Sequence, residues 1–332
     1  RLADVDGDGF ADIIVSHDSS SNQYSWVKNS TLPYMLKEIV NAYGGVTYIN
    51  YTKSTSFNNS ESGISDIGFN IFVVSEVNGN NSVVGDFNVS SDVSYNYSFG
   101  KYNYENSEFR GFKLSTERTQ SKIINHYFYQ DDPRRGKEYK TEQYDTFGNI
   151  YTKNVKEYNW TQDNGIYNLS LMYSTNYLYD GDSSDPKITN KSFEYDSYEN
   201  LLSVYDHGDV SVSGDEKWIN YSYAIHSGNW ILDKVASVTV YDPDGDKVKD
   251  TKYYYDNLGF QGQGDKGELS KVERWNNQGN NSFSYFEYDN HGNVITETDS
   301  LGYSTKYSYD EFNTYPDSMV NALGQIHIIV MI

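Results

Sequence analysis

Hydrophobic and polar residues alternate along most of this chain. In the stretch INYSYAI, the apolar residues Ile219, Tyr221, Tyr223 and Ile225 occupy every second position, and the same period recurs in FEYD and TKYSYD further along. Successive side chains of a strand point to opposite faces of a sheet, so a period of two places these residues on one face. The pattern predicts β-strands through most of the chain.

Dense turn signals separate the alternating stretches. Gly, Asn and Asp gather between them, as in FGN (147–149), DPDGD (242–246), NNQGN (276–280) and HGN (291–293). One short stretch, LPYMLKEIVNAYGG (32–45), favours a helix. We therefore predict an all-β fold built from antiparallel hairpins.

The dipeptide Tyr-Asp recurs eight times, with Tyr at positions 144, 179, 195, 205, 241, 255, 288 and 309. Chance pairing in this composition gives about three, which points to internal repeats. We expect a strand to end at each Tyr, whose ring packs on the neighbouring strand. The following Asp would accept backbone N–H groups in the turn, and Gly would supply the positive φ that the turn needs.

One stretch resembles a known repeat. Residues 288–313 fit the YD repeats of Rhs proteins at Tyr288, Asp289, Gly292, Asn293, Asp299, Gly302, Thr305, Tyr307, Tyr309 and Asp310. YDTFGN, with Tyr144 and Asp145, and YYYDNLG, with Tyr255 and Asp256, fit more loosely. YDSYEN (195–200) lacks the Gly.

A second landmark is the segment FGKYNYENSEFRGF (99–112). It resembles the E-F-R-G-F stretch in the B component of bacterial insecticidal toxin complexes, which stands between a propeller and a YD-repeat shell. The resemblance implies hairpins that wind into part of a hollow β-shell, preceded by the end of a propeller-like region. The implied division is a calcium-loop region (1–28), a connecting segment (29–68), a region with the E-F-R-G-F motif that leads into the shell (69–125) and degenerate YD repeats (126–332, clearest over 253–332).

The loop DVDGDGFAD (4–12) is the sharpest candidate site. Asp4, Asp6, Asp8 and Asp12 stand at positions 1, 3, 5 and 9, and Phe10 can offer its carbonyl at position 7. Oxygen ligands at this spacing converge on a hard cation such as Ca²⁺. A strand follows the loop, so it resembles the calcium loop of FG-GAP propeller blades. The alternative is an acidic hairpin turn.

The remaining motifs are weaker evidence for a functional site. DPDGDKVKD (242–250) repeats the acidic spacing, but Lys247 opposes a cation and a plain hairpin accounts for it. GQGDKG (262–267) has the glycine spacing of a dinucleotide loop without the strand and helix that such a site needs, so we interpret it as a loop. The six histidines are scattered, and the basic turn DDPRRGK (131–137) is typical of a solvated loop that balances local charge.

The net charge of −21 argues against nucleic-acid binding and against docking on anionic lipid. No cysteine is present, which excludes a thiolate nucleophile and disulfides. No apolar run is long enough for a membrane helix. Eleven Asn-x-Ser/Thr sequons are compatible with an extracellular protein.

The leading hypothesis is a non-catalytic shell segment of a secreted or surface Rhs/YD-repeat protein, toxin-related, which encapsulates or presents a C-terminal effector. Its partners would be the rest of its own chain, that effector, or a cell-surface or toxin-complex protein. The alternatives are an adhesin or glycan-binding repeat protein, and an enzyme whose site is dispersed over loops. We also expect the chain to be an internal piece of a longer protein, because NALGQIHIIV (321–330) starts a further repeat with an Asn-x-x-Gly turn and an apolar strand.

Overall fold

The structure, a computed structural model, describes residues 2–3, 12–16, 24–27, 35–61, 63, 66–81, 90–179, 184–262 and 264–329. Within these residues nearly every regular element is a strand; the helical segments are two single 3-10 turns, η1 (Ser54–Ser56) and η2 (Ser227–Asn229). The prediction of an all-β, antiparallel fold is confirmed. Contacts divide the chain into two compact units, residues 1–188 and 189–332.

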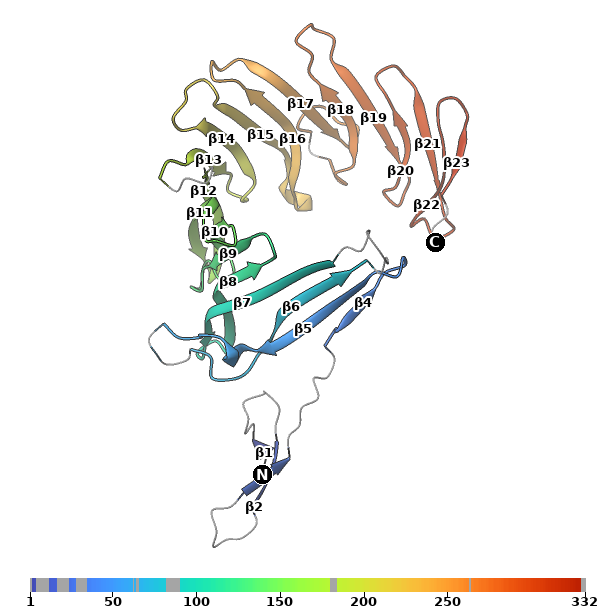
Figure 1. Cartoon of the computed structure of the whole chain (residues 1–332). Coiled ribbons are helices and arrows are strands. Elements are labelled where there is room, and N and C mark those ends of the chain that lie inside the picture. Colours follow the sequence, from blue (N-terminus) through green and yellow to red (C-terminus); the bar gives the residue numbers. More distant parts are fainter. Residues whose placement is uncertain are drawn as a thin grey trace. The chain divides into compact units, whose positions relative to one another are not determined.

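The first unit holds two antiparallel sheets (Figure 1). A small sheet has the order β1-β2-β3, and the larger sheet is a meander in which each strand pairs with the next along the chain. The strands are β1 (Leu2–Ala3), β2 (Asp12–Ser16), β3 (Tyr24–Val27), β4 (Glu38–Val40), β5 (Val46–Lys53), β6 (Phe72–Asn80), β7 (Ser90–Asn103), β8 (Glu108–Arg118), β9 (Ile123–Phe128), β10 (Glu138–Tyr144), β11 (Ile150–Asp163) and β12 (Ile166–Leu178).

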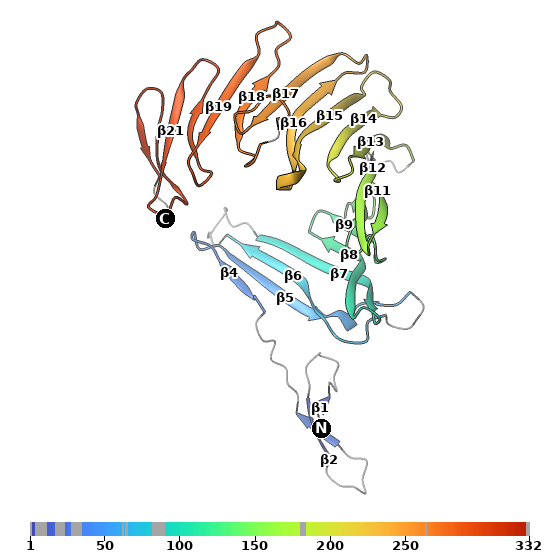
Figure 2. The same cartoon turned by 180° about the vertical axis from the view of Figure 1, so that it is seen from behind.

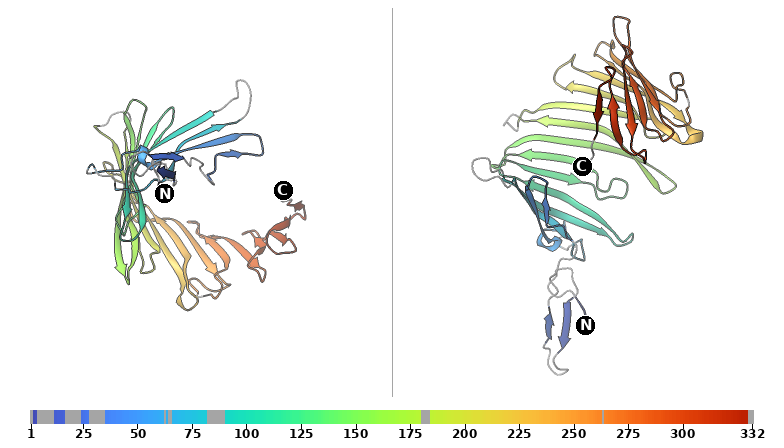
Figure 3. Two further views of the ribbon diagram at one scale, coloured as in Figure 1. Left: turned by 90° about the horizontal axis from the view of Figure 1, so that it is seen from below. Right: turned by 90° about the vertical axis from the view of Figure 1, so that its right-hand side faces the viewer.

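The second unit is also a meander of antiparallel hairpins. Its strands, yellow to red in Figures 1 and 2, follow one another in sequence order and form a single layer when viewed from below (Figure 3). They are β13 (Lys187–Tyr195), β14 (Leu201–Asp209), β15 (Lys217–His226), β16 (Ile231–Tyr241), β17 (Lys247–Tyr255), β18 (Leu269–Arg274), β19 (Ser282–Tyr288), β20 (Val294–Thr298), β21 (Ser304–Tyr309), β22 (Pro316–Val320) and β23 (Ile326–Ile328).

The strands predicted from the period of two lie where they were expected. INYSYAI falls in β15, FEYD reaches the end of β19, and TKYSYD occupies β21. The turn and apolar strand expected in NALGQIHIIV are also present, as a turn closed at Asn321 and strand β23. The boundaries proposed at residues 28, 68 and 125 remain predictions.

The prediction of a helix over residues 32–45 is wrong for the described part of that stretch. Glu38–Val40 form strand β4, and a tight turn joins them to β5. The side-chain oxygen of Asn41 accepts the N–H groups of Tyr43 and Gly45, each at 2.9 Å. Gly44 adopts a φ of 84°, a conformation in which most residues are strained. The local turn chemistry of Asn and Gly therefore overrides the helical spacing of the apolar residues.

Few side chains are fully buried. Among the described residues six hydrophobic side chains form the buried set: Ile67, Tyr179, Val204, Ala224, Ala236 and Val272. Most strand side chains are half-buried, so the described parts of the sheets have no thick apolar core. The contacts that fasten one hairpin to the next must therefore carry much of the stability, and these contacts involve the Tyr-Asp pairs.

Candidate functional site

The turn after Tyr288 shows how a Tyr-Asp pair closes a hairpin. Asp289 N–H donates to the carbonyl of Asn293 at 3.0 Å, and Oδ1 of Asp289 accepts the N–H groups of His291 and Asn293 at 2.8 and 2.9 Å. The amide of Asn293 donates to Oδ2 at 3.0 Å. Gly292 has a φ of 84°. One carboxylate thus satisfies three donors in a turn of five residues.

The same arrangement recurs in both units. In each case an Asp or Asn side-chain oxygen accepts the N–H groups of residues two and four positions on, around a residue with positive φ. The members are Asn41, Asp145, Asp196, Asp242, Asp289, Asp299 and Asn321. Asp310 closes a turn that is one residue longer.

The missing Gly in YDSYEN does not alter its turn. Glu199 takes the glycine position with a φ of 65°, and Asn200 makes the same bonds to Asp196 that Asn293 makes to Asp289. A residue with a Cβ is strained there. The turn is therefore dictated by Asp196 and Asn200 and persists at a conformational cost.

A bulge precedes each Tyr-Asp pair that ends a strand. Glu287 pairs with Thr296 but Tyr288 pairs with Val294, so Ile295 is an extra residue in the returning strand. The register shifts in the same way immediately before Tyr144, Tyr195, Tyr241, Tyr255 and Tyr309. Bulges bend a strand and increase its twist, so this shift is a regular feature of the repeat.

The hydroxyl of the Tyr fastens its hairpin to the strand before it. Tyr288 donates to the carbonyl of Leu269 at 2.9 Å, Tyr255 to Val235 at 2.8 Å and Tyr309 to Val294 at 3.0 Å. The sequence suggested only packing of the ring. We call the combination of bulge, Tyr hydroxyl bond and carboxylate-closed turn the Tyr-Asp joint.

The environment keeps the hydroxyls of Tyr255 and Tyr288 protonated. Burial, followed by the nearby Tyr253 and Asp233, raises the pKa of Tyr255 to about 12. Burial is also the main reason why the pKa of Tyr288 is raised. A phenol that holds its proton to high pH is a permanent donor, which suits a structural bond and not acid–base chemistry at neutral pH.

Two pairs make only part of this joint. Tyr255 has the bulge and the hydroxyl bond without the short turn, and Tyr144 has the bulge and the turn without a bond to a backbone carbonyl. Asp256 accepts the N–H groups of Lys266, Gly267 and Glu268 and so closes a long loop. The Tyr144 hydroxyl donates to Glu142 at 3.0 Å instead of to a backbone carbonyl.

The pair at Tyr205 lies inside β14 and closes no turn. Its Asp206 is buried and lies 3.1 Å from Lys191 and 3.5 Å from Lys217. Asp180, after Tyr179, lies outside the described residues.

The E-F-R-G-F segment forms a different kind of site. Arg110, in β8, is 4% exposed, and its guanidinium pairs with Asp132 and, at 3.4 Å, with Glu108. Arg135 also pairs with Glu108, at 2.8 Å. Asp132 and Arg135 belong to the basic turn that the sequence suggested was solvated, so the turn instead folds back onto β8. We call these four residues the EFRGF clasp.

Aromatic rings and a glutamine pack around the clasp strand. Phe112 lies 5.5 Å from Phe109 and 4.9 Å from Tyr97 between ring centroids. The side-chain amide of Gln130 donates to the carbonyls of Phe99 and Gly111, each at 2.8 Å. The segment is therefore joined to residues far along the chain through contacts that do not repeat.

The candidate calcium loop lies mostly outside the described residues. Nothing is described for Asp4, Asp6, Asp8 and Phe10, whereas Asp12 is fully buried at the start of β2, opposite Ala3. Over the described residues, no group of three or more His, Asp or Glu side chains has the geometry to hold a metal ion. The calcium site therefore remains a prediction.

The two weaker motifs, DPDGDKVKD and GQGDKG, form turns and loops of β-hairpins. In DPDGDKVKD, Asp242 closes a turn of the common type and Lys247 pairs with Asp250 at 3.2 Å, so the plain-hairpin interpretation holds. GQGDKG lies in the loop between antiparallel β17 and β18. Its Gly267 N–H donates to Asp256, so the glycines serve the loop itself.

Comparison with protein families gives two matches. Residues 1–142 match the model of the insecticide toxin TcdB middle/N-terminal region, and residues 288–315 match the RHS repeat. The second match covers the hairpins closed by Asp289, Asp299 and Asp310. A search of curated proteins gives no match.

Solved structures share the fold. The crystal structure of TcdB2-TccC3-TEV matches with a TM-score of 0.68 and 14% identity over 99% of this chain, and that of TcdB2-TccC3 matches with the same values over 100%. The Photorhabdus luminescens Tc holotoxin pore with a mutated TccC3 has a TM-score of 0.67 and 14% identity over 98% of this chain. This chain spans about a quarter of the length of each of those chains.

Proposed function

We propose that this chain is a wall segment of a larger toxin-related protein. Its family matches and its fold resemble those of Rhs-repeat and Tc-toxin proteins. Its hairpins would form part of a hollow β-shell that encapsulates or presents a C-terminal effector. The observation that carries this proposal is a pair of recurring contacts: Tyr255, Tyr288 and Tyr309 each donate a hydroxyl bond to the preceding strand, and turns closed by an Asp or Asn side chain recur in both units.

The proposed role is non-catalytic. The Asp side chains of the joints are occupied by backbone N–H groups, which lowers the pKa of Asp289 and keeps it ionised in its turn. The tyrosines are held as donors by their raised pKa values. The two most frequent chemical groups of the repeat are thus engaged in holding hairpins together, which leaves them unsuited to proton transfer.

The proposed setting is extracellular, in association with a toxin complex or a target cell. The similar structures contain TcdB2 with TccC3, and one is a Tc holotoxin pore. By analogy the partners of this chain would be the rest of its own polypeptide, a C-terminal effector and other components of such a complex. Within the described residues no helix is long and apolar enough to cross a membrane.

We also propose that residues 4–12 bind Ca²⁺. Four carboxylates at positions 1, 3, 5 and 9 of the loop support this proposal, and the last of them, Asp12, is fully buried at the start of β2. The cation would draw the loop oxygens together and neutralise their repulsion. Asp6→Ala and Asp8→Ala should each weaken calcium binding sharply in calorimetry, and a wild-type chain that takes up no calcium would refute this proposal.

Protection from proteolysis tests the wall proposal. The test uses the longer protein that the proposal requires, in which a C-terminal segment follows residue 332. This protein is digested with a protease under native conditions. We expect the C-terminal segment to survive within the whole protein and to be degraded when it is produced alone. Equal rates of degradation in the two preparations would contradict encapsulation.

A further inference from the structure

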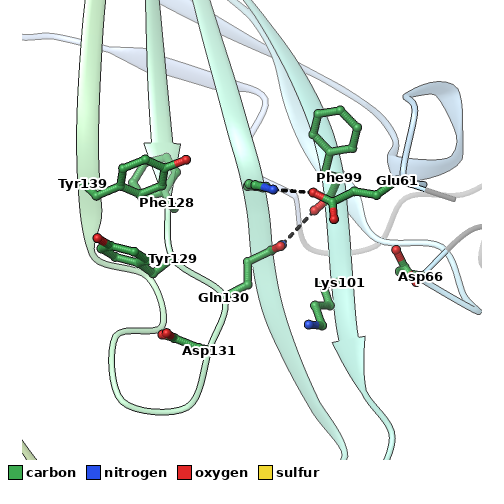
Figure 4. A pocket seen from close by; sticks show the side chains of 10 residues that line it. Glu61, Asp66, Phe99, Lys101, Phe128, Tyr129, Gln130, Asp131 and Tyr139 are labelled. Atoms are coloured by element: carbon green, nitrogen blue, oxygen red, sulfur yellow. Dashed lines mark hydrogen bonds and ion pairs between the residues drawn. The ribbon is translucent and has the colours of Figure 1, made fainter. Parts of the chain in front are cut away.

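A hollow of about 570 Å³ lies beside the EFRGF clasp, in the first unit (Figure 4). Its volume falls within the range of about 300–1,000 Å³ that is usual for small-molecule sites. It is lined by residues of β7, β8, β9 and β10, by the residues that follow β9, and by Glu61 and Asp66. None of the joints described above requires such a hollow.

One side of the hollow is aromatic. Phe128, Tyr129 and Tyr139 lie together on the side of β9 and β10 (Figure 4), and each is partly exposed. Tyr129 and Tyr139 have their ring centroids 4.6 Å apart, and the guanidinium of Arg134 lies 3.9 Å from the centre of the Tyr129 ring. The rings are therefore held in place before any ligand arrives, so ordering them costs a ligand little.

Charged side chains also line the hollow, and four of the charges here are paired. Lys113 pairs with Glu61 on the side opposite the rings, and Asp131, beside Tyr129, pairs with Arg134 through Nε at 3.0 Å (Figure 4). Within each pair the opposite charges neutralise each other, so these four side chains attract an ionic ligand only weakly. The carboxylate of Asp66 and the ammonium of Lys101 line the same hollow, and both have no side-chain partner among the described residues. One strong acceptor and one strong donor are thus available.

We propose that this hollow binds a short neutral oligosaccharide. A pyranose ring presents an apolar C–H face that suits an aromatic wall, and its hydroxyl groups both donate and accept hydrogen bonds. Asp66 would accept from one hydroxyl and Lys101 would donate to another. Three carboxylates and two ammonium groups line the hollow, so a simple ion would find little net charge to pair with, and a purely apolar ligand would leave the hydrogen-bonding capacity of Asp66 and Lys101 unused. The inference does not rest on the shell proposal.

The whole 332-residue chain is titrated by calorimetry with maltotriose, cellotriose and triacetylchitotriose, and with L-tyrosine as a zwitterionic aromatic probe. We expect at least one trisaccharide to bind. Asp66→Asn and Lys101→Gln should each weaken that binding about tenfold, since each removes a charged hydrogen-bond partner. Asp244→Asn and Lys306→Gln change an exposed carboxylate and an exposed lysine elsewhere, and should leave binding unchanged.

Three results would overturn the proposal. The first is that none of the trisaccharides binds the wild-type chain. The second is that a trisaccharide binds Asp66→Asn and Lys101→Gln as tightly as the wild type, because the sugar would then lie elsewhere. The third is that L-tyrosine binds with dependence on Asp66 and Lys101 while the sugars do not, which would assign the hollow to a zwitterionic ligand.

Discussion

The Tyr-Asp hairpins of the second unit and the EFRGF clasp of the first are stabilised in opposite ways. In the hairpins, the same few bonds recur: Asp289 closes its own turn, and Tyr288 reaches the adjacent strand. In the clasp, a buried Arg110 depends on Asp132, from a loop that follows the next strand. Repetition distributes stability over many replaceable contacts, whereas the clasp concentrates it in contacts that occur once.

The clasp should therefore be the more sensitive of the two regions. Arg110→Ala removes a buried guanidinium and its stem and leaves a cavity beside Glu108 and Asp132. We expect a loss of about 2–4 kcal/mol in the free energy of unfolding, measured with urea. Arg118→Ala, in the exposed end of the same strand, should cost less than about 0.5 kcal/mol. Similar losses for both variants would show that the clasp is no special site.

Backbone conformation in the turns gives the next largest effect. At Gly292 a Cβ would meet nothing within 4 Å, so the cost of Gly292→Ala comes from its φ of 84° alone, about 1–2 kcal/mol. Glu199→Gly should have the opposite sign and raise stability by up to about 1 kcal/mol. Gly259 also has open space but no positive φ, so Gly259→Ala is the control and should be neutral or slightly stabilising. A destabilised Glu199→Gly protein would contradict the equivalence of the two turns.

Removal of one joint hydroxyl should have a smaller effect. Tyr255→Phe keeps the ring but loses the bond to the Val235 carbonyl, at an expected cost of about 1 kcal/mol. Tyr303→Phe removes a hydroxyl from a ring that is 60% exposed and should change nothing measurable in thermal or urea unfolding. Equal stability of the two variants would mean that the hydroxyl bond contributes nothing.

The smallest expected effect is a dependence on pH. Bonds from the backbone N–H and then the side-chain amide of Asn293 lower the pKa of Asp289 in the folded protein. The stability that this provides is present above the unfolded pKa of about 3.9 and is lost as the pH falls through the lower folded value. Asp289→Asn keeps the turn, as Asn321 does in its own hairpin. Urea midpoints of the two proteins should therefore differ slightly at pH 7 and converge as the pH falls through the lowered folded pKa of Asp289; a constant difference would refute the linkage.

How far the sequence predicts the fold depends on how local its determinants are. The Tyr288 and Tyr309 hairpins could be predicted, because the period of two, the turn Asp and the Gly lie within a few residues of one another. The same local chemistry at Asn41 was missed, because apolar spacing over 32–45 suggested a helix. The bulges before each Tyr and the bonds of its hydroxyl depend on the neighbouring strand, whose register the period alone does not give.

The clasp and the hollow beside it could not be predicted from the sequence, because their residues lie far apart along the chain. Arg110 and Asp132 are 22 positions apart, and Glu61 lies 52 positions from its partner Lys113. No periodicity links them, and DDPRRGK has the composition of an ordinary solvated turn. The resemblance of 99–112 to a known segment marked the place but not the ion pairs. Contacts of this kind become visible only when the chain is folded.

The Tyr-Asp pair at Tyr288 acts as a structural joint between neighbouring hairpins. Hydrogen–deuterium exchange of Tyr288→Phe, compared with wild type and with Tyr303→Phe, isolates this role. We expect faster exchange in Tyr288→Phe within residues 269–298, where the hydroxyl bond to Leu269 is lost, with unchanged exchange in β13–β16. Exchange in residues 269–298 that is identical in all three proteins would contradict it.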